Sequence, residues 1–341
     1  MDEIQEQSQE IQQGFRVDLE KLHIPSLVTL KAYNHEYYLA GRDNRWFQEL
    51  LKIYNECSIH SAILNNLHLK IMALQPSGTT EDDLYNMCLL DYIIYGGFAV
   101  EIIWNMSHTN IIKANHLDFS KIRAGMICKE TGDVENYLFS NDWFKYNNKF
   151  KTTLENFDIS SGTDEHQIYY YCRYSPSSEI YPKPYYNAAL KWLYTDIQLE
   201  TYFANLIKNN FVGNIILSVN SYMDQDKQHN FERAVKHSFT GSENAGSIMV
   251  MYNESKENAP EIVEFNKGAD DLKYQWLTDK VVEQISIGHG LPIQLLGILV
   301  AGKLGNSTEL PVYEKIYHDT IVIPTKKQFD KGYMEIKKRI I

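Results

Sequence analysis

AALKWLYTDIQLETYFANLIKNN, residues 188–210, decides how the chain is organised, because it has the pattern of one long helix with Asn187 as its N-cap. Its large apolar side chains cover more than one stripe of that helix: Leu190, Leu193, Ile197, Leu199, Phe203, Leu206 and Ile207. A helix that is apolar on several sides packs against several neighbours. We therefore expect it to contact more than one other element, in its own chain or in a second copy.

A compact insert follows this helix. Residues 211–266 contain three strand-like runs, GNIILSVN, SIMVMYN and EIVEFN, and a helix-like run from Asp224 to Phe239. Strands that alternate with a helix are typical of a small α/β unit. The composition of this insert therefore predicts a self-contained α/β module.

A second long helix is predicted over 270–287, because the run GHGLP at 288–292 interrupts the helical pattern. A loop rich in small residues, ILVAGKLGNS, comes next. The run NSTE at 306–309 can cap a third helix that continues to about Val322, and Pro324 is expected to break or kink it. Two long helices thus bracket the insert, and a third follows the loop.

The N-terminal part of the chain begins with helical text. Apolar residues recur at helical spacing over 44–56 and 59–74. The run TEDD at 80–83 resembles a capping box, and we expect it to start a helix through Leu89 and Ile94. Gly96-Gly97 ends this helix, since glycine accepts the left-handed conformation of a helix C-terminus.

Strand-like text follows these helices directly. FAVEIIWN at 98–105 and IIKANHL at 111–117 are separated by the turn-like run MSHTN, which predicts two paired strands. Short aromatic-rich runs broken by ETGD, SND and SSGTDEH occupy 125–174. We expect a β-rich layer packed on the preceding helices, and an α+β fold class for the chain.

The composition is that of a folded protein. Of 341 residues, 44% are hydrophobic and 23% are charged, which is too apolar for a disordered chain. No run approaches the roughly 18 apolar residues that a membrane span requires. The opening run MDEIQEQSQEIQQG is acidic and glutamine-rich, unlike a signal peptide, and we expect a solvated arm and no membrane partner. This indicates a chain that stays in the cytoplasm where it is made.

The formal net charge is −11, with 44 acidic residues against 33 basic ones. A conventional DNA-binding protein gains affinity from basic residues that neutralise phosphates. The net charge of this chain does not suit a surface that binds DNA tightly, although it is compatible with other DNA-handling functions.

The sharpest enzyme-like motif is GILVAGK at 297–303, which matches the phosphate-binding pattern G-x-x-x-x-G-K. Leu304 occupies the position where such a loop needs a serine or threonine to bind magnesium. The motif also follows a Gly/Pro-broken segment rather than a clean strand. We therefore interpret it as a loop with one exposed cation, Lys303, and expect no nucleotide cofactor.

Four cysteines, Cys57, Cys88, Cys128 and Cys172, are dispersed without framework spacing and are expected to be reduced. Cys57 and His60 form a lone C-x-x-H, which is half of a zinc motif without a second half. A buried cysteine on a helix is the simpler interpretation, and we expect no metal site.

Other candidate sites have structural explanations. Asp82-Asp83 and Asp270-Asp271 are acid pairs that could hold magnesium in a nuclease, but both stand at predicted helix starts, where carboxylates favour the helix dipole. YYYC at 169–172 could stack bases, yet alternating aromatics in strands are more often cross-strand packing. Local chemistry therefore indicates no catalytic residues and no enzyme.

The order of these elements resembles the portal proteins of tailed bacteriophages, the HK97-like and PBSX-type portal family. The resemblance covers most of the chain and rests on five blocks in the same order: YNECSIHSAILNNLHLKIMAL at 54–74, LLDYIIYGGFAVEIIWN at 89–105, SEIYPKPYYNAALKWLYTDIQLETYFANLIKNNFVGNIIL at 178–217, residues 277–297 with GHGLPIQLLG, and 306–308 leading to Pro324. Tyr181-Pro182 and Asn209-Asn210 stand where the family has Tyr-Gly and Asn-Gly. Little sequence follows Pro324, so we expect either a crown that is short or absent, or a sequence that is a truncated form.

The resemblance assigns a part to each segment. It implies an N-terminal arm (1–43), a mixed α/β wing in two parts (44–185 and 307–341, the second with the kinked helix), two stem helices (186–210 and 267–290), a clip (211–266) and a tunnel-loop region (291–306). The residues it would place along a DNA channel are those of the tunnel loop: Val300, Ala301, Gly302, Lys303, Leu304, Gly305 and Asn306.

The resemblance also implies a function and partners. Portal subunits form a cyclic ring, commonly a dodecamer, at one capsid vertex, through which double-stranded DNA is packaged and ejected without sequence specificity. The implied partners are further copies of the chain, the terminase large subunit, the major capsid protein and a head–tail connector or adaptor. The implied location is the virion, and the host cytoplasm during assembly. The alternatives are a metal-dependent nucleic-acid enzyme or another head–tail connector subunit.

The acidic charge fits such a channel. Each ion contact that a channel wall makes with a phosphate must break as the duplex advances, so a basic wall would slow the DNA. We hypothesise a neutral or acidic wall that keeps the DNA centred, with sparse cations such as Lys303. Isolated subunits should then bind DNA weakly.

Overall fold

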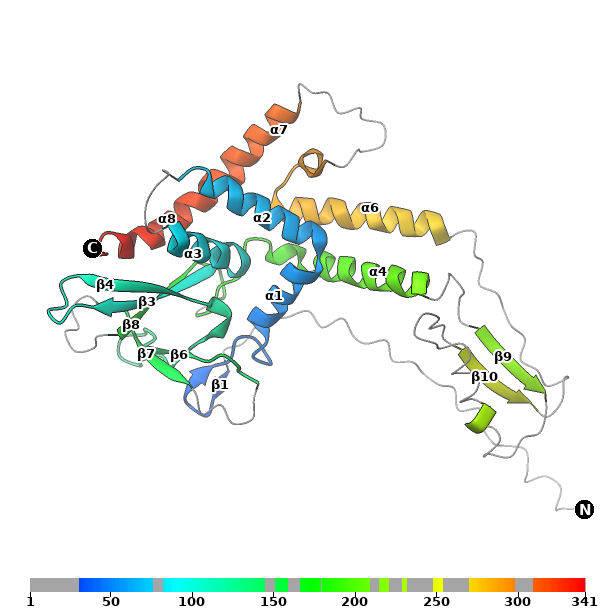
Figure 1. Cartoon of the computed structure of the whole chain (residues 1–341), viewed down its shortest axis with the longest axis horizontal. Coiled ribbons are helices and arrows are strands. Elements are labelled where there is room, and N and C mark those ends of the chain that lie inside the picture. The colour runs from blue at the N-terminus through cyan, green and yellow to red at the C-terminus, as the bar shows by residue number, and fades with distance from the viewer. Residues whose placement is uncertain are drawn as a thin grey trace, which may run out of the picture.

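The computed structural model describes residues 31–75, 82–144, 151–158, 166–178, 180–208, 215–220, 229–231, 248–253, 270–297 and 309–340. Figure 1 shows helices and a sheet packed into one body, from which a pair of long helices projects. The mixture of helices with a largely antiparallel sheet is α+β, as the sequence predicts. No helix in the described ranges has both the length and the apolar character to cross a membrane.

The body contains a six-stranded sheet in the order β4-β3-β8-β7-β6-β5. Its strands are β3 (Gly97–Trp104), β4 (Ile111–Leu117), β5 (Ile122–Ala124), β6 (Asn136–Phe139), β7 (Thr152–Asn156) and β8 (His166–Cys172). The pairs are antiparallel except β7 with β8, which is parallel. A 3₁₀ turn, η1 (Phe119–Lys121), joins β4 to β5. The predicted strands at 98–105 and 111–117 are thus confirmed as the pair β3 and β4.

Three helices precede the sheet in the chain, as predicted: α1 (Trp46–Glu56), α2 (Ser58–Met72) and α3 (Asp82–Tyr95). The predicted end of α3 is also confirmed. Gly96 has a φ of +86°, and a Cβ there would lie 2.9 Å from the carbonyl oxygen of Lys183. Only glycine fits that conformation and that contact, so the chain turns from α3 into β3 without a connecting loop.

A short hairpin stands ahead of α1. It pairs β1 (Ala32–Tyr33) with β2 (Tyr37–Tyr38). Tyr37 is buried and its ring packs on Trp143 at a centroid distance of 4.9 Å. Residues 31–43, which we assigned to the N-terminal arm, therefore lie against the body, whereas residues 1–30 of that arm are outside the described residues.

The two long helices of the projecting pair are α4 (Leu190–Lys208) and α6 (Asp270–His289). Two predicted ends were wrong. Asn187 does not cap α4, because a 3₁₀ turn, η2 (Asn187–Ala189), leads into the helix and Tyr186 precedes that turn. Gly288 does not end α6, which continues to His289. A residue without a side chain is needed at position 288 because Ala189, just before α4, lies against it.

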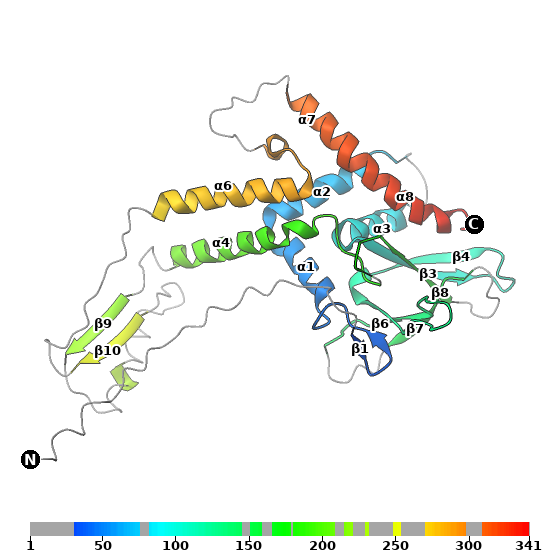
Figure 2. The same cartoon turned by 180° about the vertical axis from the view of Figure 1, so that it is seen from behind.

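Along the chain, the described parts of the insert come between α4 and α6. β9 (Ile215–Asn220) and β10 (Ile248–Asn253) pair in parallel, with Ile215 opposite Ile248. Residues 229–231 are helical and fall inside the predicted helix. A parallel pair requires a crossover between its strands, which agrees with an α/β module. Figures 1 and 2 both show β9 and β10 beyond the free ends of α4 and α6. The predicted strand EIVEFN is outside the described residues.

We predicted a break or a kink at Pro324; the C-terminal segment stays helical there, so the helix does not break, and it departs from regular α geometry just before the proline. α7 (Leu310–Tyr317) passes into a π-helical turn, η5 (His318–Val322), and then into α8 (Ile323–Lys337). Pro324 stands in the first turn of α8, where the backbone N–H that proline lacks needs no partner within that helix. The wider π turn ahead of it gives the ring room. α7 begins at Leu310 after Glu309, and the predicted cap at Asn306 is outside the described residues.

Aromatic side chains join α8 to α3 and the sheet. Phe329 packs on Tyr85, Phe98 and Tyr92 at centroid distances between 4.9 and 5.5 Å. Gly332 lies against the ring of Tyr171, where a Cβ would meet ring atoms at 2.6 Å. The C-terminal helix is therefore fixed to the same core as the N-terminal helices.

Candidate functional site

The projecting pair is held together at both ends. A Cβ added to Gly288 of α6 would lie 2.4 Å from the Cβ of Ala189, so the backbones approach closely beside the body. At the far end, the hydroxyls of Tyr202 and Tyr274 are 2.8 Å apart and their rings stack at 5.3 Å. The helices are thus antiparallel along their length (Figure 2). The predicted bracketing of the insert by two packed helices is confirmed.

Polar contacts from α1 and α2 attach the pair to the body. The Cys57 thiol donates to a carboxylate oxygen of Asp196 at 3.1 Å, and the Ser58 hydroxyl donates to Glu200 at 3.2 Å. Two residues before Asp196 on α4, the Tyr194 hydroxyl donates to Glu49 at 2.9 Å. α4 is therefore attached to the body by contacts from residues 194 to 200.

A buried histidine pair lies where α2 meets the end of α6. Nδ1 of His60 and Nε2 of His289 are 3.0 Å apart, and the Tyr185 hydroxyl lies 2.8 Å from Nδ1 of His289. The two histidines are at most 1% exposed. Burial lowers the pKa of His289 to about 3, and burial followed by the neighbouring His289 lowers the pKa of His60 well below its usual range.

The protons of this pair can be arranged in two ways. Either His289 donates to His60 and accepts from Tyr185, or His60 donates to His289, which donates to Tyr185. Both arrangements leave the rings neutral, and in both Nε2 of His60 has no partner among the described residues. We call His60, His289, Tyr185, Cys57 and Asp196 the joint, because they link the body to the projecting helices.

One face of α6 exposes large apolar side chains. Trp276 is 66% exposed and Ile287 is 62% exposed. They are 11 residues apart, which is three turns, so they lie on the same side of the helix. An exposed ion pair between Lys280 and Glu283 (2.9 Å) stands between them. Single exposed apolar residues are ordinary on a surface, but two large ones aligned on a projecting helix mark a face suited to a partner.

A second buried polar group, Arg123 of β5, holds the N-terminal segment on the sheet. Its guanidinium is 0% exposed and donates to Asn44 Oδ1 at 2.5 Å, to the Asn44 carbonyl at 3.0 Å and to the carbonyls of Ser120 and Ile122 at 2.9 and 2.7 Å. The rings of Phe47 and Trp143 flank it within 5.4 Å. Burial lowers its pKa to about 10, so it remains charged at neutral pH.

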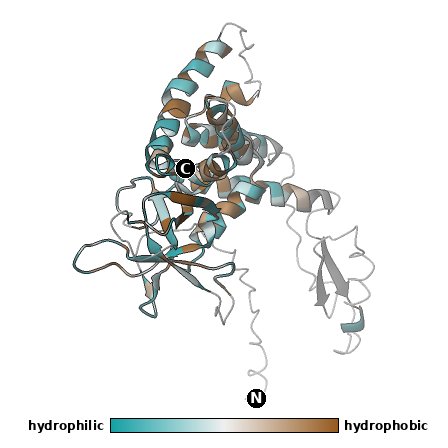
Figure 3. Cartoon of the chain, turned by 60° about the vertical axis from the view of Figure 1, so that its left-hand side comes forward, coloured by the Kyte–Doolittle hydropathy of each residue, from teal (hydrophilic) through white to brown (hydrophobic). Residues whose placement is uncertain are grey.

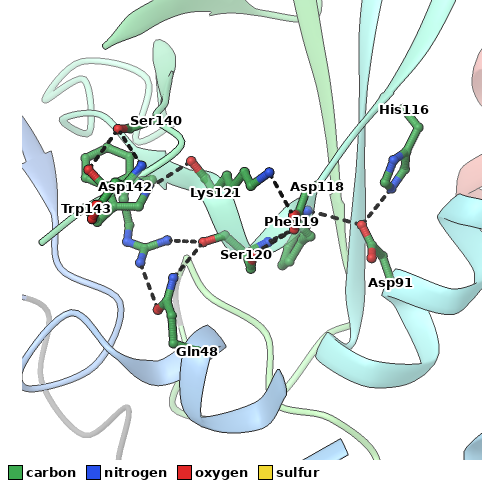
Figure 4. A network of polar contacts seen from close by, with 11 residues as sticks. Gln48, Asp91, His116, Asp118, Phe119, Ser120, Lys121, Ser140, Asp142 and Trp143 are labelled. Atoms are coloured by element: carbon green, nitrogen blue, oxygen red, sulfur yellow. Dashed lines mark hydrogen bonds and ion pairs between the residues drawn. The ribbon is translucent and has the colours of Figure 1, made fainter. Parts of the chain in front are cut away.

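Figure 4 shows the contacts that continue from this group. Gln48 donates to the Ser120 carbonyl at 3.2 Å, and Asp91 accepts from His116 at 2.8 Å and from the Phe119 backbone N–H at 3.1 Å. The network fixes η1 between α1 and α3. No sequence pattern predicts this network, since Arg123 is a lone basic residue in a short strand and no spacing singles it out.

No family model matches the chain, and no curated protein matches it either. Solved structures of gene transfer agent (GTA) particles do contain chains of similar fold. One belongs to the neck of an empty particle computed with C6 symmetry (TM-score 0.54, 12% identity, 85% of this chain and 80% of that chain). Another belongs to the neck of a native particle computed with C12 symmetry (TM-score 0.54, 11% identity, 86% and 81%). A third belongs to the virion of a native GTA particle (TM-score 0.51, 12% identity, 85% and 81%).

At these identities the likeness shows a shared fold. It covers at least 85% of this chain. The mixed α+β architecture is therefore that of a chain found in phage-like neck assemblies.

The predicted tunnel loop, Val300 to Asn306, is outside the described residues, so the structure places none of its side chains. The first part of the wider tunnel-loop region, residues 291–297, is described. A 3₁₀ turn, η4 (Ile293–Leu296), ends at Gly297, whose φ is +73°. A phosphate-binding loop would follow a strand, whereas here it follows α6 and this turn. The GILVAGK run therefore lacks the structural context of a nucleotide site.

The other sequence candidates lie apart. Cys57 bonds to Asp196 and His60 pairs with His289, and the described part of the chain contains no group of three or more possible metal ligands. Asp82-Asp83 and Asp270-Asp271 open α3 and α6, as expected. Tyr171 of β8 lies opposite Phe98 of β3, with the ring centroids 5.3 Å apart, and Tyr170 stacks on Tyr137 of β6 at 4.4 Å. The interpretation of YYYC as cross-strand packing is confirmed.

Proposed function

We propose that this chain is a portal subunit, which assembles into a closed ring at the neck of a phage-like particle. The observation that carries the proposal is the fold likeness to chains in GTA necks over 85% of this chain. Those necks were computed with C6 and C12 symmetry, which supports a cyclic assembly of this chain. A head-to-tail contact closes into a ring when its rotation divides a full turn.

The exposed face of α6 supplies a surface for that contact. Trp276 and Ile287 are more than 60% exposed although α6 already packs on α4 with its other side. In a ring, this face would pack on the neighbouring subunit and remove both side chains from water. Burying a large apolar side chain contributes about 1.5–3 kcal/mol, and a ring of n subunits repeats this gain n times.

The proposed ring is a passive conduit for double-stranded DNA at one capsid vertex. α4 and α6 would be its stem and residues 211–266 its clip, where the terminase large subunit and later a head–tail adaptor would dock. The body would face the major capsid protein, and Val300 to Asn306 would form the tunnel loop. Energy for packaging would come from the terminase, because we propose that this chain has no catalysis of its own.

Measurement of the assembly mass tests the proposal. A dodecamer of 39.7-kDa chains would weigh about 480 kDa, and negative-stain images should show rings with a central channel. Assembly should be followed at several concentrations and with capsid and terminase partners present, since a ring can require them. Only monomers under all of these conditions would contradict the proposal, and a solid, non-annular complex would favour another head–tail connector subunit.

Substitution of the α6 face separates assembly from folding. Trp276→Ala with Ile287→Ala should abolish the ring and leave the circular dichroism spectrum and melting of the subunit unchanged. Tyr174→Ala is the matched control, because Tyr174 is 85% exposed and lies on the segment after β8. Rings that form equally in both variants would show that this face is not the subunit contact.

The absence of catalysis is tested with the acid pairs. Purified chain incubated with magnesium and plasmid DNA should leave the DNA intact. Cleavage that disappears in the Asp270→Ala, Asp271→Ala variant would instead establish the alternative, a metal-dependent nuclease.

A further inference from the structure

The C-terminal helix carries a charge opposite to that of the protein. Residues 323–340 contain six basic residues and two acidic ones, a net charge of +4. The whole chain has a net charge of −11, so its other residues together carry −15. The basic residues are Lys326, Lys327, Lys331, Lys337, Lys338 and Arg339. Such an asymmetry within one chain is typical of a segment that meets a polyanion.

The helix buries one side and exposes the other. Phe329, Tyr333 and Ile336 are 0% exposed and face the core. Lys327, Lys331 and Lys338 are exposed at positions i, i+4 and i+11, which lie within about 40° of one another around the helix. Lys338 keeps helical backbone angles at the end of α8, so the three lysines form one straight stripe.

The acidic groups of this helix do not neutralise the stripe. Asp330 accepts from Lys326 and from the Tyr85 hydroxyl, and Glu335 accepts from the Tyr169 hydroxyl at 2.9 Å. Among the described residues, the ammonium groups of the three stripe lysines have no ion-pair or hydrogen-bond partner. Their charge is available to a partner from outside the chain.

We propose that this stripe binds the phosphate backbone of double-stranded DNA, without reading its sequence. The stripe is about 16 Å long at 1.5 Å per residue. A duplex carries one phosphate charge per about 1.7 Å of its axis. Each lysine can therefore contact a phosphate at any register of the duplex along the stripe. A folded acidic protein would instead have to place three carboxylates in matching positions.

The chemistry of the stripe also limits what it can do. Lysine ammonium groups are point charges that bind phosphate without the paired donors of arginine, which read guanine edges. Three contacts surrounded by an acidic chain give weak binding that exchanges easily. The stripe therefore holds DNA loosely beside the body and leaves the proposed channel free of strong contacts. It rests on the proposed function only for the presence of duplex DNA in the particle.

The salt dependence of DNA binding tests the stripe. Fluorescence anisotropy with a labelled random-sequence duplex should give a slope of log K against log salt concentration that becomes about 3 units shallower in the Lys327→Gln, Lys331→Gln, Lys338→Gln variant. Affinity near 50 mM salt should fall at least about ten-fold. Two duplexes of different sequence should bind equally.

A matched variant controls for net charge. Lys52→Gln, Lys113→Gln, Lys129→Gln removes three exposed lysines from α1, β4 and the β5–β6 connection, and should keep the slope of the wild type. Equal slopes in wild type, stripe variant and control would overturn the proposal. Charge-dependent binding of a peptide of residues 1–14, with no binding of duplex, would also overturn it and assign the stripe to the acidic arm of another copy.

Assembly mass recorded on the same samples separates this inference from the proposed function. Rings with an unchanged slope would reject the stripe and leave the portal proposal in place. A chain that stays monomeric here and with its capsid and terminase partners, but loses three phosphate contacts in the stripe variant, would reject the ring and retain the DNA-binding stripe.

Discussion

Two of the places where the described residues bury polar groups treat those groups in opposite ways. Around Arg123 the group stays charged, because neutral carbonyl oxygens and two aromatic rings replace the water it has lost. At the joint, His60 and His289 share one hydrogen bond and give up their charge, since burial lowers the pKa of both. A buried ionisable group must be either solvated by dipoles or discharged.

The difference has consequences for the two regions. The Arg123 network fixes α1 and η1 against the sheet and should be insensitive to pH across the neutral range. The histidine pair lies where the projecting helices meet the body, and its neutrality holds only while the pH stays high enough. The body is thus held by a permanent charge, and the joint by a histidine pair whose neutrality depends on the pH.

Arg123→Met should lower the free energy of unfolding more than any other change predicted below. It takes the Arg123 donors away from the buried carbonyls of Asn44, Ser120 and Ile122, of which Ser120 keeps its donor from Gln48, and the free energy of unfolding should fall by about 3–5 kcal/mol. Chemical denaturation measures this loss. Lys129→Met, an exposed substitution of similar type, should change it by less than about 0.5 kcal/mol. A small loss at Arg123 would show that the body does not depend on its buried charge.

Acidification should destabilise the protein through the joint. A histidine whose folded-state pKa is depressed contributes stability above the unfolded pKa of about 6.5, and this is lost as the pH falls from there toward the folded pKa, about 3 for His289. At pH 5 the loss should be about 2 kcal/mol per histidine relative to pH 7.5. Denaturation at a series of pH values gives this curve.

The carboxyl of Asp196 and the phenols of Tyr185, Tyr186 and Tyr317 also face or adjoin the joint. Burial raises the pKa of each, so these groups do not add to the loss. The variant His60→Asn, His289→Gln removes the two titrating rings, and its stability should depend less steeply on pH below 6.5. An unchanged slope would place the pH dependence elsewhere.

The close approach at the joint leads to a third prediction of intermediate size. Gly288→Ala should lower the free energy of unfolding by about 1–3 kcal/mol, because the new Cβ would meet that of Ala189 at 2.4 Å. Adding Ala189→Gly should recover most of the loss by restoring the space. A double variant as unstable as the single one would show that contact with the Ala189 side chain does not set the cost, since Gly→Ala by itself favours a helix.

Cys57→Ala should have the smallest effect. It removes the thiol that donates to Asp196 and leaves that carboxylate with one partner fewer, at a cost of about 1 kcal/mol. Cys57→Ser restores an O–H donor at the same position and should recover part of it. Equal stability of the two variants in denaturant would show that the contact between α2 and α4 depends on packing alone.

Much of the fold could be predicted from local patterns. The spacing of apolar residues located α1, α2, α4 and α6, and alternation located β3 and β4, because these signals depend on neighbours along the chain. The ends were harder. Asn187 has the residue type of a cap, yet Tyr186 donates to the carbonyl of Ile94 at 2.6 Å and the chain enters α4 through a 3₁₀ turn. Pro324 has the residue type of a break, yet a π turn accommodates it.

The contacts of the candidate site were harder to predict from the sequence than the fold was. His60 and His289 each stood in a run that the sequence analysis examined, but 229 residues separate them and no local pattern pairs them. The same holds for Arg123 and Asn44, which are 79 residues apart. Contacts between residues so far apart depend on how helices and strands pack, and a single sequence does not record that packing.

The sequence by itself determined the element order, the two long helices around an α/β insert, and the charge contrast between an acidic chain and its basic C-terminal helix. These follow from side-chain type and spacing alone. Only the tertiary structure decided that Trp276 and Ile287 remain exposed, that two histidines meet and become neutral, and that three lysines of α8 are left without partners. Exposure, protonation and pairing depend on which surfaces are covered, and packing alone sets that.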